Sequence, residues 1–559
     1  MCFRQLFKRI PSFSKTGRCS LACLNMAQAL GVVNDNIFKF TMVFLLIETL
    51  GAAEASSILS ATGAIYVIPF LLFSSYAGIL ADRLSKQKLL VFMKGIEVLA
   101  MGIAIIAFAA RAPWLCYGLL FILAIHSAVM SPSKYGMIPE LVSQYVVPRA
   151  NGLITSTSYL AIIFGTFLAS FLTEKTHSQF TWVACICFVI AIGGFFAALG
   201  IKKTPEQAAK VKAHPFFLKE IYYTLKIASL TPHLVTAIFS SAFFLFVGAF
   251  TQLNVIPFAI QTLHLSEIAG GYLFLVSALG IAAGAFLSGK LSRYKTALGL
   301  SCLACLGIAI NFLFLSITKS LPLVVISLVL IGAFGGLFAV PFDTFIQLNS
   351  KDERRGQMIA AANFFSFTGV FIASLLLYIF SQFLALSSAN GFAAVATLTF
   401  LVFLILISRL SEFFFSLLAK IFFFFSSVCH IEFSAWEANS SAILILEKAS
   451  FRKAFFLASK FPMMHFLFPS NRSKQPWYCR LMYSLHAAPK GLDTHELIAY
   501  AQTQLLPEKP ICLFFRKTFQ IPTSTMYGWI ELFQTKPLVF LVRFYKEKRG
   551  WVCKLEKEN

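Results

Sequence analysis

The sequence has few charged side chains, and acidic ones are the scarcest. Of its 559 residues, 13% are charged and 58% are hydrophobic, whereas soluble domains carry roughly 25% charged residues. This shortage excludes a chain whose main solvent is water. Apolar runs of roughly 18 residues or more recur between Thr41 and Ile407, and each is long enough to cross the membrane as a helix. The sequence therefore predicts an all-α membrane protein.

Basic residues outnumber acidic ones and are concentrated in particular segments. The chain has 47 Lys and Arg against 24 Asp and Glu, a formal net charge of +23, which in a soluble protein would suggest nucleic acid as a partner. Here the basic residues lie before residue 25, near 83–88, in 202–219 and on alternate loops further along. The positive-inside rule predicts this pattern for cytoplasmic loops. We therefore expect no nucleic-acid partner, both termini in the cytoplasm and an even number of spans.

The apolar runs and the basic stretches divide the chain into five segments. These are a basic cytoplasmic arm (1–25), a six-helix bundle (26–200), a basic cytoplasmic linker (201–230), a second six-helix bundle (231–408) and a cytoplasmic domain (409–559). Charge becomes frequent in the last segment, and its runs 442–446 and 511–515 resemble strands. The last segment is therefore predicted to be a small α/β domain.

Residues 78–88, GILADRLSKQK, resemble the loop motif that follows the second helix of major facilitators, and a similar stretch begins at Leu291 in the second half. The resemblance implies twelve transmembrane helices in two parallel repeats of six. Gly78 would permit close helix approach, and Asp82 would pair with Arg83 or with a helix end to hold one state closed. The alternative is a solvated turn that only obeys the positive-inside rule. The predicted gate comprises Gly78, Asp82, Arg83, Arg149, Arg354 and Arg355.

Polar residues interrupt the first span at Asn34, Asp35, Asn36 and Lys39. Ionisable groups are costly inside a membrane and usually face a cavity or a partner. Two interpretations remain open: these side chains receive a zwitterionic or anionic head group, or Asp35 and Lys39 neutralise each other one turn apart on the helix.

Two further polar positions lie in the third and fourth predicted spans. Glu97 follows Lys94 at i,i+3, and His126 stands alone in the fourth span. We assign Glu97 and His126 to the substrate cavity on weaker grounds than the first-span residues. A packing role is the stronger alternative for the lone histidine. No metal site and no cofactor are predicted.

Several separated motifs resemble the lysophospholipid transporter family within the major facilitators. They are NDNIFK at 34–39, SPSKYGMIPE at 131–140, PRANG at 148–152, PFDTFIQ at 341–347, ERRGQ at 353–357 and AAN at 361–363. The resemblance implies a flippase that transfers lysophospholipid, chiefly lysophosphatidylethanolamine, to the cytoplasmic leaflet of a bacterial inner membrane. It also implies alternating access by rocking of the two halves.

Some members of that family are fused to a glycerolipid acyltransferase, which the segment after residue 409 resembles. That enzyme needs the motif Asn-His-x-Ser-x-x-Asp, in which the histidine removes a proton from the acceptor hydroxyl and the aspartate orients the histidine. The matching positions here are Glu447, Lys448, Ser450 and Lys453, so only the serine is kept. A second motif, Phe-Pro-Glu-Gly-Thr, matches 514–518 with Arg516 and Lys517 in place of its centre. We therefore expect a degenerate, non-catalytic domain.

The basic residues that replace the catalytic ones have two interpretations. They would gather positive charge beside the membrane and bind anionic lipid head groups or an acyl carrier protein, or they would reflect drift on a solvated surface. Two alternative functions also remain open. One is a transporter fused to a working acyltransferase that reacylates the delivered lipid, and the other is an exporter of small amphiphiles.

Overall fold

The computed structural model describes residues 15–206, 216–292 and 297–410, the pairs 413–414 and 417–418, and six strands between 429 and 557. Twelve helices in these residues are long and apolar enough to cross a membrane, which confirms the predicted spans. The first six are α2 (Lys15–Leu50), α3 (Ala55–Arg83), α4 (Lys86–Ala109), α5 (Pro113–Leu141), α6 (Val147–Lys175) and α7 (Phe180–Leu199). The last six are α9 (Leu234–Leu263), α10 (Glu267–Leu291), α11 (Leu298–Ile317), α12 (Leu321–Asn349), α13 (Arg355–Tyr378) and α14 (Ser388–Arg409).

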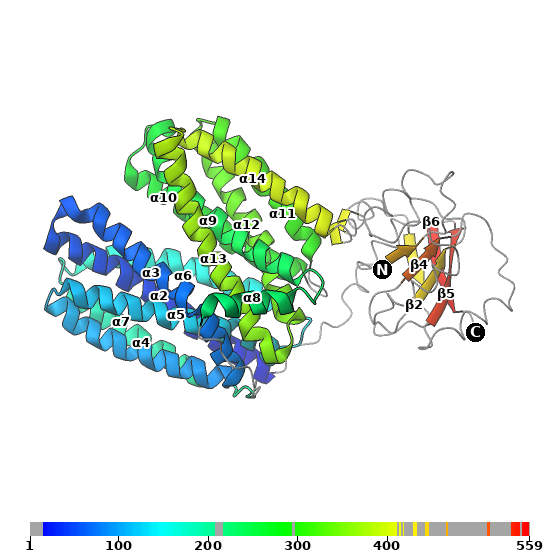
Figure 1. Ribbon diagram of the computed structural model, residues 1–559, viewed down its shortest axis with the longest axis horizontal. Coiled ribbons are helices and arrows are strands. Elements are labelled where there is room, and N and C mark those ends of the chain that lie inside the picture. The colour runs from blue at the N-terminus through cyan, green and yellow to red at the C-terminus, as the bar shows by residue number, and fades with distance from the viewer. Residues whose placement is uncertain are drawn as a thin grey trace. The chain divides into compact units, whose positions relative to one another are not determined.

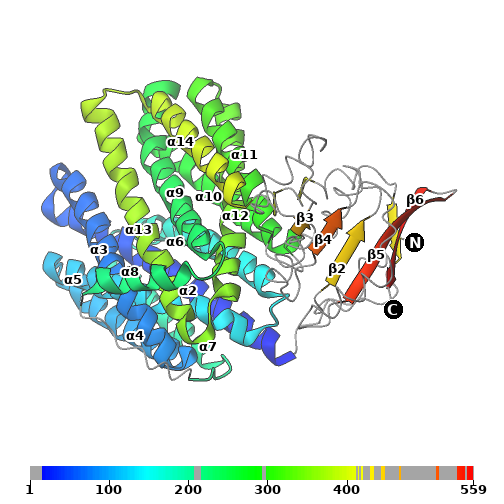
Figure 2. The ribbon, with the colours of Figure 1, turned by 45° about the vertical axis from the view of Figure 1, so that its right-hand side comes forward.

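The twelve helices form two bundles of six, coloured blue to cyan and green to yellow in Figure 1. The short amphipathic helix α8 (Phe217–Ala228) precedes the second bundle and contacts α3 and α13. We call the side of the bundles that carries residues 84–85, 142–146 and 350–354 the linker side, because α8 lies there as well. The two bundles lie close together near α8 and diverge toward their other ends (Figures 1 and 2).

The first helix begins at Lys15, so the boundary expected at residue 26 is too late. The early part of α2 is held by packing: Leu21 and Leu24 are buried in a cluster with Ala198 and Ile201. In addition, the Lys202 N–H donates to Ser20 Oγ over 3.1 Å. Tertiary contacts therefore extend the helix through a stretch whose basic residues suggested a separate arm.

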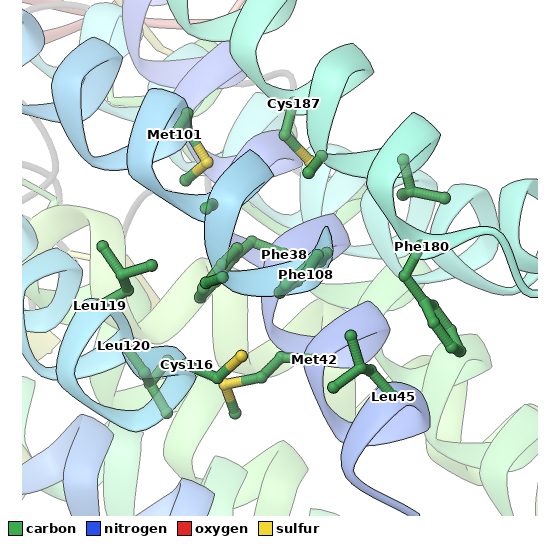
Figure 3. Packing of buried hydrophobic residues seen from close by; sticks show 14 of the residues in the cluster. Phe38, Met42, Leu45, Met101, Phe108, Cys116, Leu119, Leu120, Phe180 and Cys187 are labelled. Carbon is green, nitrogen blue, oxygen red and sulfur yellow. The ribbon is translucent and has the colours of Figure 1, made fainter. Parts of the chain in front are cut away.

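The first bundle has an apolar core in which α2, α4, α5 and α7 meet (Figure 3). The rings of Phe38 and Phe108 stack with centroids 5.5 Å apart. Cys116 and Cys187 are buried beside them as small apolar groups. The second bundle uses more aromatic rings, with Phe392 of α14 packed against Phe258 and Phe312 at centroid distances of 5.3 and 5.7 Å.

Glycines allow α10 and α12 to approach closely. A Cβ on Gly280 or Gly284 of α10 would collide with the backbone carbonyls of Val329 and Ala333 of α12. Without water, helices in a membrane associate largely by close van der Waals packing, and small residues permit it. This pair of helices therefore forms a tight unit within the second bundle.

The last unit of the chain contains a six-stranded sheet in the order β1-β6-β5-β2-β4-β3. Its strands are β1 (Cys429–Glu432), β2 (Ala442–Leu446), β3 (His465–Leu467), β4 (Ile511–Phe514), β5 (Leu538–Glu547) and β6 (Gly550–Lys557). All neighbours are parallel except β5 and β6. The two strand-like runs of the sequence are confirmed as β2 and β4. The residues between the strands lie outside the described part, so the α/β class stays a prediction.

We expect Gly284→Ala to destabilise the protein by about 1–3 kcal/mol, the usual cost of overpacking, because the added methyl meets the α12 backbone. Gly271→Ala on the same helix is the matched control, since a Cβ there has nothing within 4 Å. The melting temperature of the detergent-solubilised protein measures both. Equal melting temperatures for the two variants would contradict the close approach of α10 and α12.

Candidate functional site

A cavity of about 150 Å³ lies between the two bundles. Its wall combines hydroxyl, amide and carboxyl groups with aromatic and aliphatic side chains. The first bundle contributes Tyr135, Thr155, Ser158 and Tyr159, and the second contributes Ser241, Phe244, Leu245, Ala339, Asp343, Ile346, Gln347, Ile359, Ala362, Asn363 and Ser366. Such a mixed wall suits a ligand with both a polar and an apolar part.

The cavity has an acidic side chain on the second bundle and a basic one close by on the first. Asp343 of α12 lines the cavity and accepts a hydrogen bond from Ser241 Oγ at 2.8 Å. Lys134 of α5 has its Nζ 4.5 Å from the centroid of the Tyr135 ring, and its charge interacts with that of Asp343. Sequence reasoning gave neither charge a role.

A signal for this pair was present in the sequence. Lys134 and Asp343 each stand two residues after a proline that lies inside a helix, Pro132 in α5 and Pro341 in α12. These helices occupy equivalent places in the two repeats. Comparing the two halves position by position would have identified the pair.

On the linker side, Asp82 joins α3 to the start of α13. Its Oδ1 accepts the Gly356 N–H at 2.6 Å and its Oδ2 accepts the Gln357 N–H at 2.9 Å, and the residue is 1% exposed. The first N–H groups of a helix lack partners within the helix and carry a partial positive charge, which a carboxylate neutralises. Of the two partners expected for Asp82, the structure therefore provides the helix end.

Gly78 lies one turn before Asp82 and makes this contact possible. A Cβ at Gly78 would be 2.8 Å from the Gly356 carbonyl oxygen and 2.6 Å from the Ala360 Cβ. Any larger residue would push α3 away from α13, and the two hydrogen bonds of Asp82 would lengthen.

Among the predicted gate arginines, Arg355 has the most buried position. Its Nε donates to the Gln347 carbonyl at 2.8 Å, and it pairs with Asp352. Arg355 Nη1 also lies 4.0 Å from Glu140 of the first bundle, which is paired at 2.6 Å with the fully buried Lys86. Arg83 and Arg149 are exposed and Arg354 is half-buried.

A second contact between the bundles was missed by sequence reasoning. Asn151 of α6 donates to Thr344 Oγ1 at 2.9 Å and to Gln347 Oε1 at 3.0 Å, and it accepts from Gln347 Nε2 at 3.0 Å. Next to it, Gly152 packs against the backbone of Gly289 in α10. Asn151 and Gly152 lie in the sequence motif at 148–152, but the partners of Asn151 are almost 200 residues away along the chain.

Helix α8 adds a third element to this side (Figure 2). Glu220 is buried on its inner face and accepts a hydrogen bond from Gln357 Nε2 at 2.8 Å. Gln357 thus contacts Asp82 through its backbone and Glu220 through its side chain. The linker is therefore attached to the same point at which the two bundles meet.

The structure places the polar residues of the first span, which were predicted to bind substrate, in two different surroundings. Asn34 lies in a buried cluster with Glu97, His126 and Lys94, and the adjacent Asp35 accepts a hydrogen bond from Ser127 Oγ at 3.1 Å. Asn36 donates to the Val32 carbonyl and Lys39 lies over the rings of Phe40 and Tyr66.

The possible ion pair between Asp35 and Lys39, both of which the structure describes, is not formed. None of the six predicted substrate residues lines the cavity of about 150 Å³. Their role in substrate binding stays a prediction.

Comparisons with known proteins identify relatives of this chain. The "Lysophospholipid transporter LplT" of Escherichia coli O1:K1 / APEC is 28% identical over 345 residues, which cover 60% of this chain and 83% of that protein. The protein of the same name from Klebsiella pneumoniae subsp. pneumoniae is 26% identical over 374 residues, covering 63% of this chain and 86% of that protein.

Solved structures with low sequence identity share the fold. The human organic anion transporter MFSD10 aligns with a TM-score of 0.58 at 13% identity, covering 70% of this chain and 100% of that one. The Escherichia coli fucose:proton symporter FucP aligns with a TM-score of 0.57 at 14% identity, covering 70% and 98%. The family model described as Major Facilitator Superfamily matches residues 24–374. This match, together with the two bundles of six helices, shows that the chain belongs to the major facilitator superfamily.

Proposed function

We propose that the protein is a flippase that moves lysophospholipid across the bacterial inner membrane by alternating access. The observation that carries the proposal is the mixed polar and apolar cavity between two bundles whose contacts on the linker side include hydrogen bonds that can separate. Among them are two backbone hydrogen bonds at Asp82 and the side-chain hydrogen bonds of Asn151. The related LplT proteins, described as lysophospholipid transporters, support the class of substrate.

The linker side is proposed to face the cytoplasm. Lys86, Lys88, Lys202, Lys203 and Lys351 lie at the helix ends or loops of this side, and the positive-inside rule assigns such residues to the cytoplasm. Both termini would then be cytoplasmic. Because the bundles meet on this side, the proposed state of the transporter is one that is closed to the cytoplasm.

The proposed substrate is lysophosphatidylethanolamine, a lipid with an anionic phosphate, a cationic amine and one acyl chain. The carboxylate of Asp343 would pair with the amine and the ammonium of Lys134 with the phosphate, as buried charges require opposite partners. Phe244 and Leu245 on the same wall would contact the apolar part. The first-span residues Asn36 and Lys39 would lie along the route of the head group.

The last segment is proposed to be an acyltransferase-like domain without catalytic activity. The mostly parallel sheet is consistent with an α/β fold, and the sequence has Lys448 and Lys453 at the positions that require His and Asp. Those positions, together with Glu447, Ser450, Arg516 and Lys517, lie outside the described residues. Anionic lipid head groups, an acyl carrier protein or a separate acyltransferase are its proposed partners.

Replacement of Asp343 tests the substrate site. We expect Asp343→Asn to lower uptake of labelled lysophosphatidylethanolamine into proteoliposomes roughly tenfold or more, because a charge-assisted contact worth about 1.5–3 kcal/mol is lost. Glu48→Gln is the control. The Glu48 carboxylate is partly exposed, lies near the end of α2 and pairs with Arg111. Wild-type uptake by Asp343→Asn would remove Asp343 from the site. Transport of small amphiphiles but of no lysophospholipid by the wild type would favour the exporter.

Replacement of Asp82 tests the proposed gate. We expect Asp82→Asn to loosen the linker side because the helix end of α13 loses its anionic partner. The probe is a cysteine at position 366 in a protein whose twelve native cysteines have been replaced. In Asp82→Asn this cysteine should react about tenfold faster than in the Asp82 background with an impermeant maleimide added on the cytoplasmic side, if the closed linker side loses roughly 1.4 kcal/mol of stability.

Glu206→Gln is the control for this labelling, because the Glu206 carboxylate is exposed on the linker side and its pair with Lys88 is solvated. Equal labelling rates for Asp82→Asn and the unchanged background would contradict the gating role of Asp82.

Removal of residues 411–559 tests the separation of the two parts. We expect the truncated protein to keep most of its lysophospholipid uptake, because the cavity and the contacts between the bundles all lie before residue 410. The measurement is uptake in proteoliposomes at matched protein density. A folded, membrane-inserted truncation without uptake would show that the last segment takes part in transport.

A further inference from the structure

The two bundles also meet where α6 and α10 cross, near the linker-side ends of both helices. A Cβ at Gly289 of α10 would be 3.2 Å from the Arg149 Cα and 3.1 Å from the Pro148 carbonyl oxygen of α6. A Cβ at Gly152 would be 2.5 Å from the Ala285 carbonyl oxygen. The backbones of the two bundles therefore touch at these residues, and we call this contact the α6–α10 seam.

Two basic side chains lie at the α6–α10 seam, one from each bundle. Arg149 of α6 and Lys290 of α10 are both exposed, and Lys290 directly follows the glycine that meets the Arg149 backbone. Lys290 Nζ lies 4.3 Å from the centroid of the Phe286 ring. Among the residues that the structure describes in the two bundles, neither basic side chain is paired with a carboxylate.

Helix geometry places both charges on the same flank of the seam. With about 100° of rotation per residue, Arg149 is turned about 60° from Gly152, and Lys290 about 100° from Gly289 in the same sense. Because α6 begins and α10 ends on the linker side, the two helices run in opposite directions, and equal senses of rotation lead to one flank. Thr155 and Ser158, which line the cavity, are turned from Gly152 in the other sense. The two charges therefore lie on the flank away from the cavity.

The same flank exposes apolar side chains further along both helices. Leu153 and Leu160 follow Arg149 on one face of α6, and Leu279 and Phe286 precede Lys290 on one face of α10; all four are exposed. Exposed apolar side chains of a membrane-spanning helix contact lipid acyl chains. The flank thus presents two positive charges at its linker-side end and an apolar surface beyond them, which is the order of charge and chain in a phospholipid.

The two positive charges lack the anion that the other linker-side contact has. At α3 and α13 the carboxylate of Asp82 accepts two N–H groups across the bundles. At the α6–α10 seam two like charges are brought together, which is unfavourable without an anion between them. The contact of Lys290 with the Phe286 ring stabilises the ammonium but does not cancel its charge. An anion from outside the chain would complete this contact.

We propose that the α6–α10 seam binds a membrane phospholipid with an anionic head group, whose phosphate bridges Arg149 and Lys290. The planar guanidinium of Arg149 can donate two parallel hydrogen bonds to phosphate oxygens, and the Lys290 ammonium adds a point charge. The acyl chains lie along the exposed leucines of α6 and α10. A head group of net negative charge, such as phosphatidylglycerol, is preferred to phosphatidylethanolamine, because the two cations repel an amine. This site is separate from Lys134 and Asp343 of the proposed substrate cavity.

The position of the Lys290 ammonium favours a lipid over a soluble anion. A lysine near the end of a membrane helix usually extends outward to water, whereas the Lys290 side chain turns back along α10 over the ring of Phe286. The ammonium therefore lies level with exposed apolar side chains rather than beyond the helix end. Anionic lipids of the cytoplasmic leaflet attract basic residues at this depth.

A bound lipid of this kind would favour the closed linker side. Arg149 belongs to the first bundle and Lys290 to the second, so separation of the bundles on the linker side would draw the two side chains apart. A phosphate that contacts both would then lose one partner. This effect on closing rests on the proposed alternating access, whereas lipid binding itself does not.

Binding is tested on the full-length protein, reconstituted in vesicles of phosphatidylcholine and phosphatidylglycerol and then released into mild detergent. Native mass spectrometry should show retained phosphatidylglycerol, and Arg149→Gln or Lys290→Gln should each lower the ratio of bound phosphatidylglycerol to bound phosphatidylcholine roughly fivefold. Both side chains are exposed, so the variants should fold. Lys175→Gln is the matched control, since that exposed lysine stands over the Phe171 ring at the other end of α6. Retention by Arg149→Gln and Lys290→Gln equal to that of Lys175→Gln would overturn the site.

Two further lipid measurements identify the ligand. Excess inorganic phosphate should leave the retained phosphatidylglycerol in place, because phosphate has no acyl chain to contact the flank. Displacement by phosphate would overturn the assignment to a lipid. Equal retention of phosphatidylethanolamine and phosphatidylglycerol would overturn the assignment to an anionic head group.

The effect on closing is tested with spin labels at Lys88→Cys and Lys351→Cys, two exposed positions on the linker side of different bundles, after replacement of the native cysteines. Distances between the labels are measured in nanodiscs of phosphatidylcholine with and without phosphatidylglycerol. Phosphatidylglycerol should raise the ratio of short to long distances roughly fivefold or more. Lys290→Gln should lose this dependence and Lys175→Gln should keep it. A ratio that does not respond to phosphatidylglycerol would overturn the effect on closing.

The outcomes separate this proposal from the proposed function. If the wild type moves no lysophospholipid, the flippase proposal fails and retention of phosphatidylglycerol still decides whether the α6–α10 seam binds lipid. If lysophospholipid uptake is present but no phosphatidylglycerol is retained, the lipid site fails and the flippase proposal stands.

Discussion

The carboxylate of Asp82 joins the two bundles through two hydrogen bonds, and in the proposed mechanism it holds the linker side closed. A buried helix start has N–H groups that lack partners within the helix and are not reached by water. Asp82 provides two acceptors and a negative charge for the start of α13, although it belongs to α3 of the other bundle. Gly78 and Gly356 allow the backbones to come close enough for this contact. The same interaction therefore satisfies a local requirement and fixes the relative position of the bundles.

Three sets of polar residues in the described membrane-spanning part have different surroundings. Those on the linker side bridge the bundles, those around Asp343 border a cavity, and those around Glu97 are enclosed within one bundle. Because charge within a membrane is costly without a partner, each set requires its own system of partners. Two of the sets lie along the boundary between the bundles, whereas the third reaches that boundary through α2, α5 and α6.

The spans could be predicted because each depends on a continuous stretch of residues. Hydrophobic length decides whether a helix crosses a membrane, and the strands β2 and β4 were likewise visible as short apolar runs. The first helix was placed too late because its start depends on contacts with Ala198 and Ile201, which lie far along the chain. Asp82 was identified with a helix end among its expected partners, but the sequence could not specify α13.

The candidate site was less accessible to sequence reasoning. The sequence indicated that Glu97 and His126 were unusual, but only the structure shows that Asn34 brings the first span to them. Asp343, Lys134 and Asn151 lay in recognised motifs without an assigned role, because a motif does not specify which side of a helix faces a cavity. Their importance depends on neighbours that are distant along the chain.

The attachment of α8 has a consequence for how the halves can separate. Gln357 is bonded to Asp82 of one bundle and to Glu220 of the linker, and α8 contacts both α3 and α13. If α3 moves away from α13, helix α8 must lose its contacts with one of these two helices. In the proposed mechanism, helix α8 would therefore move together with one of the two bundles when they separate.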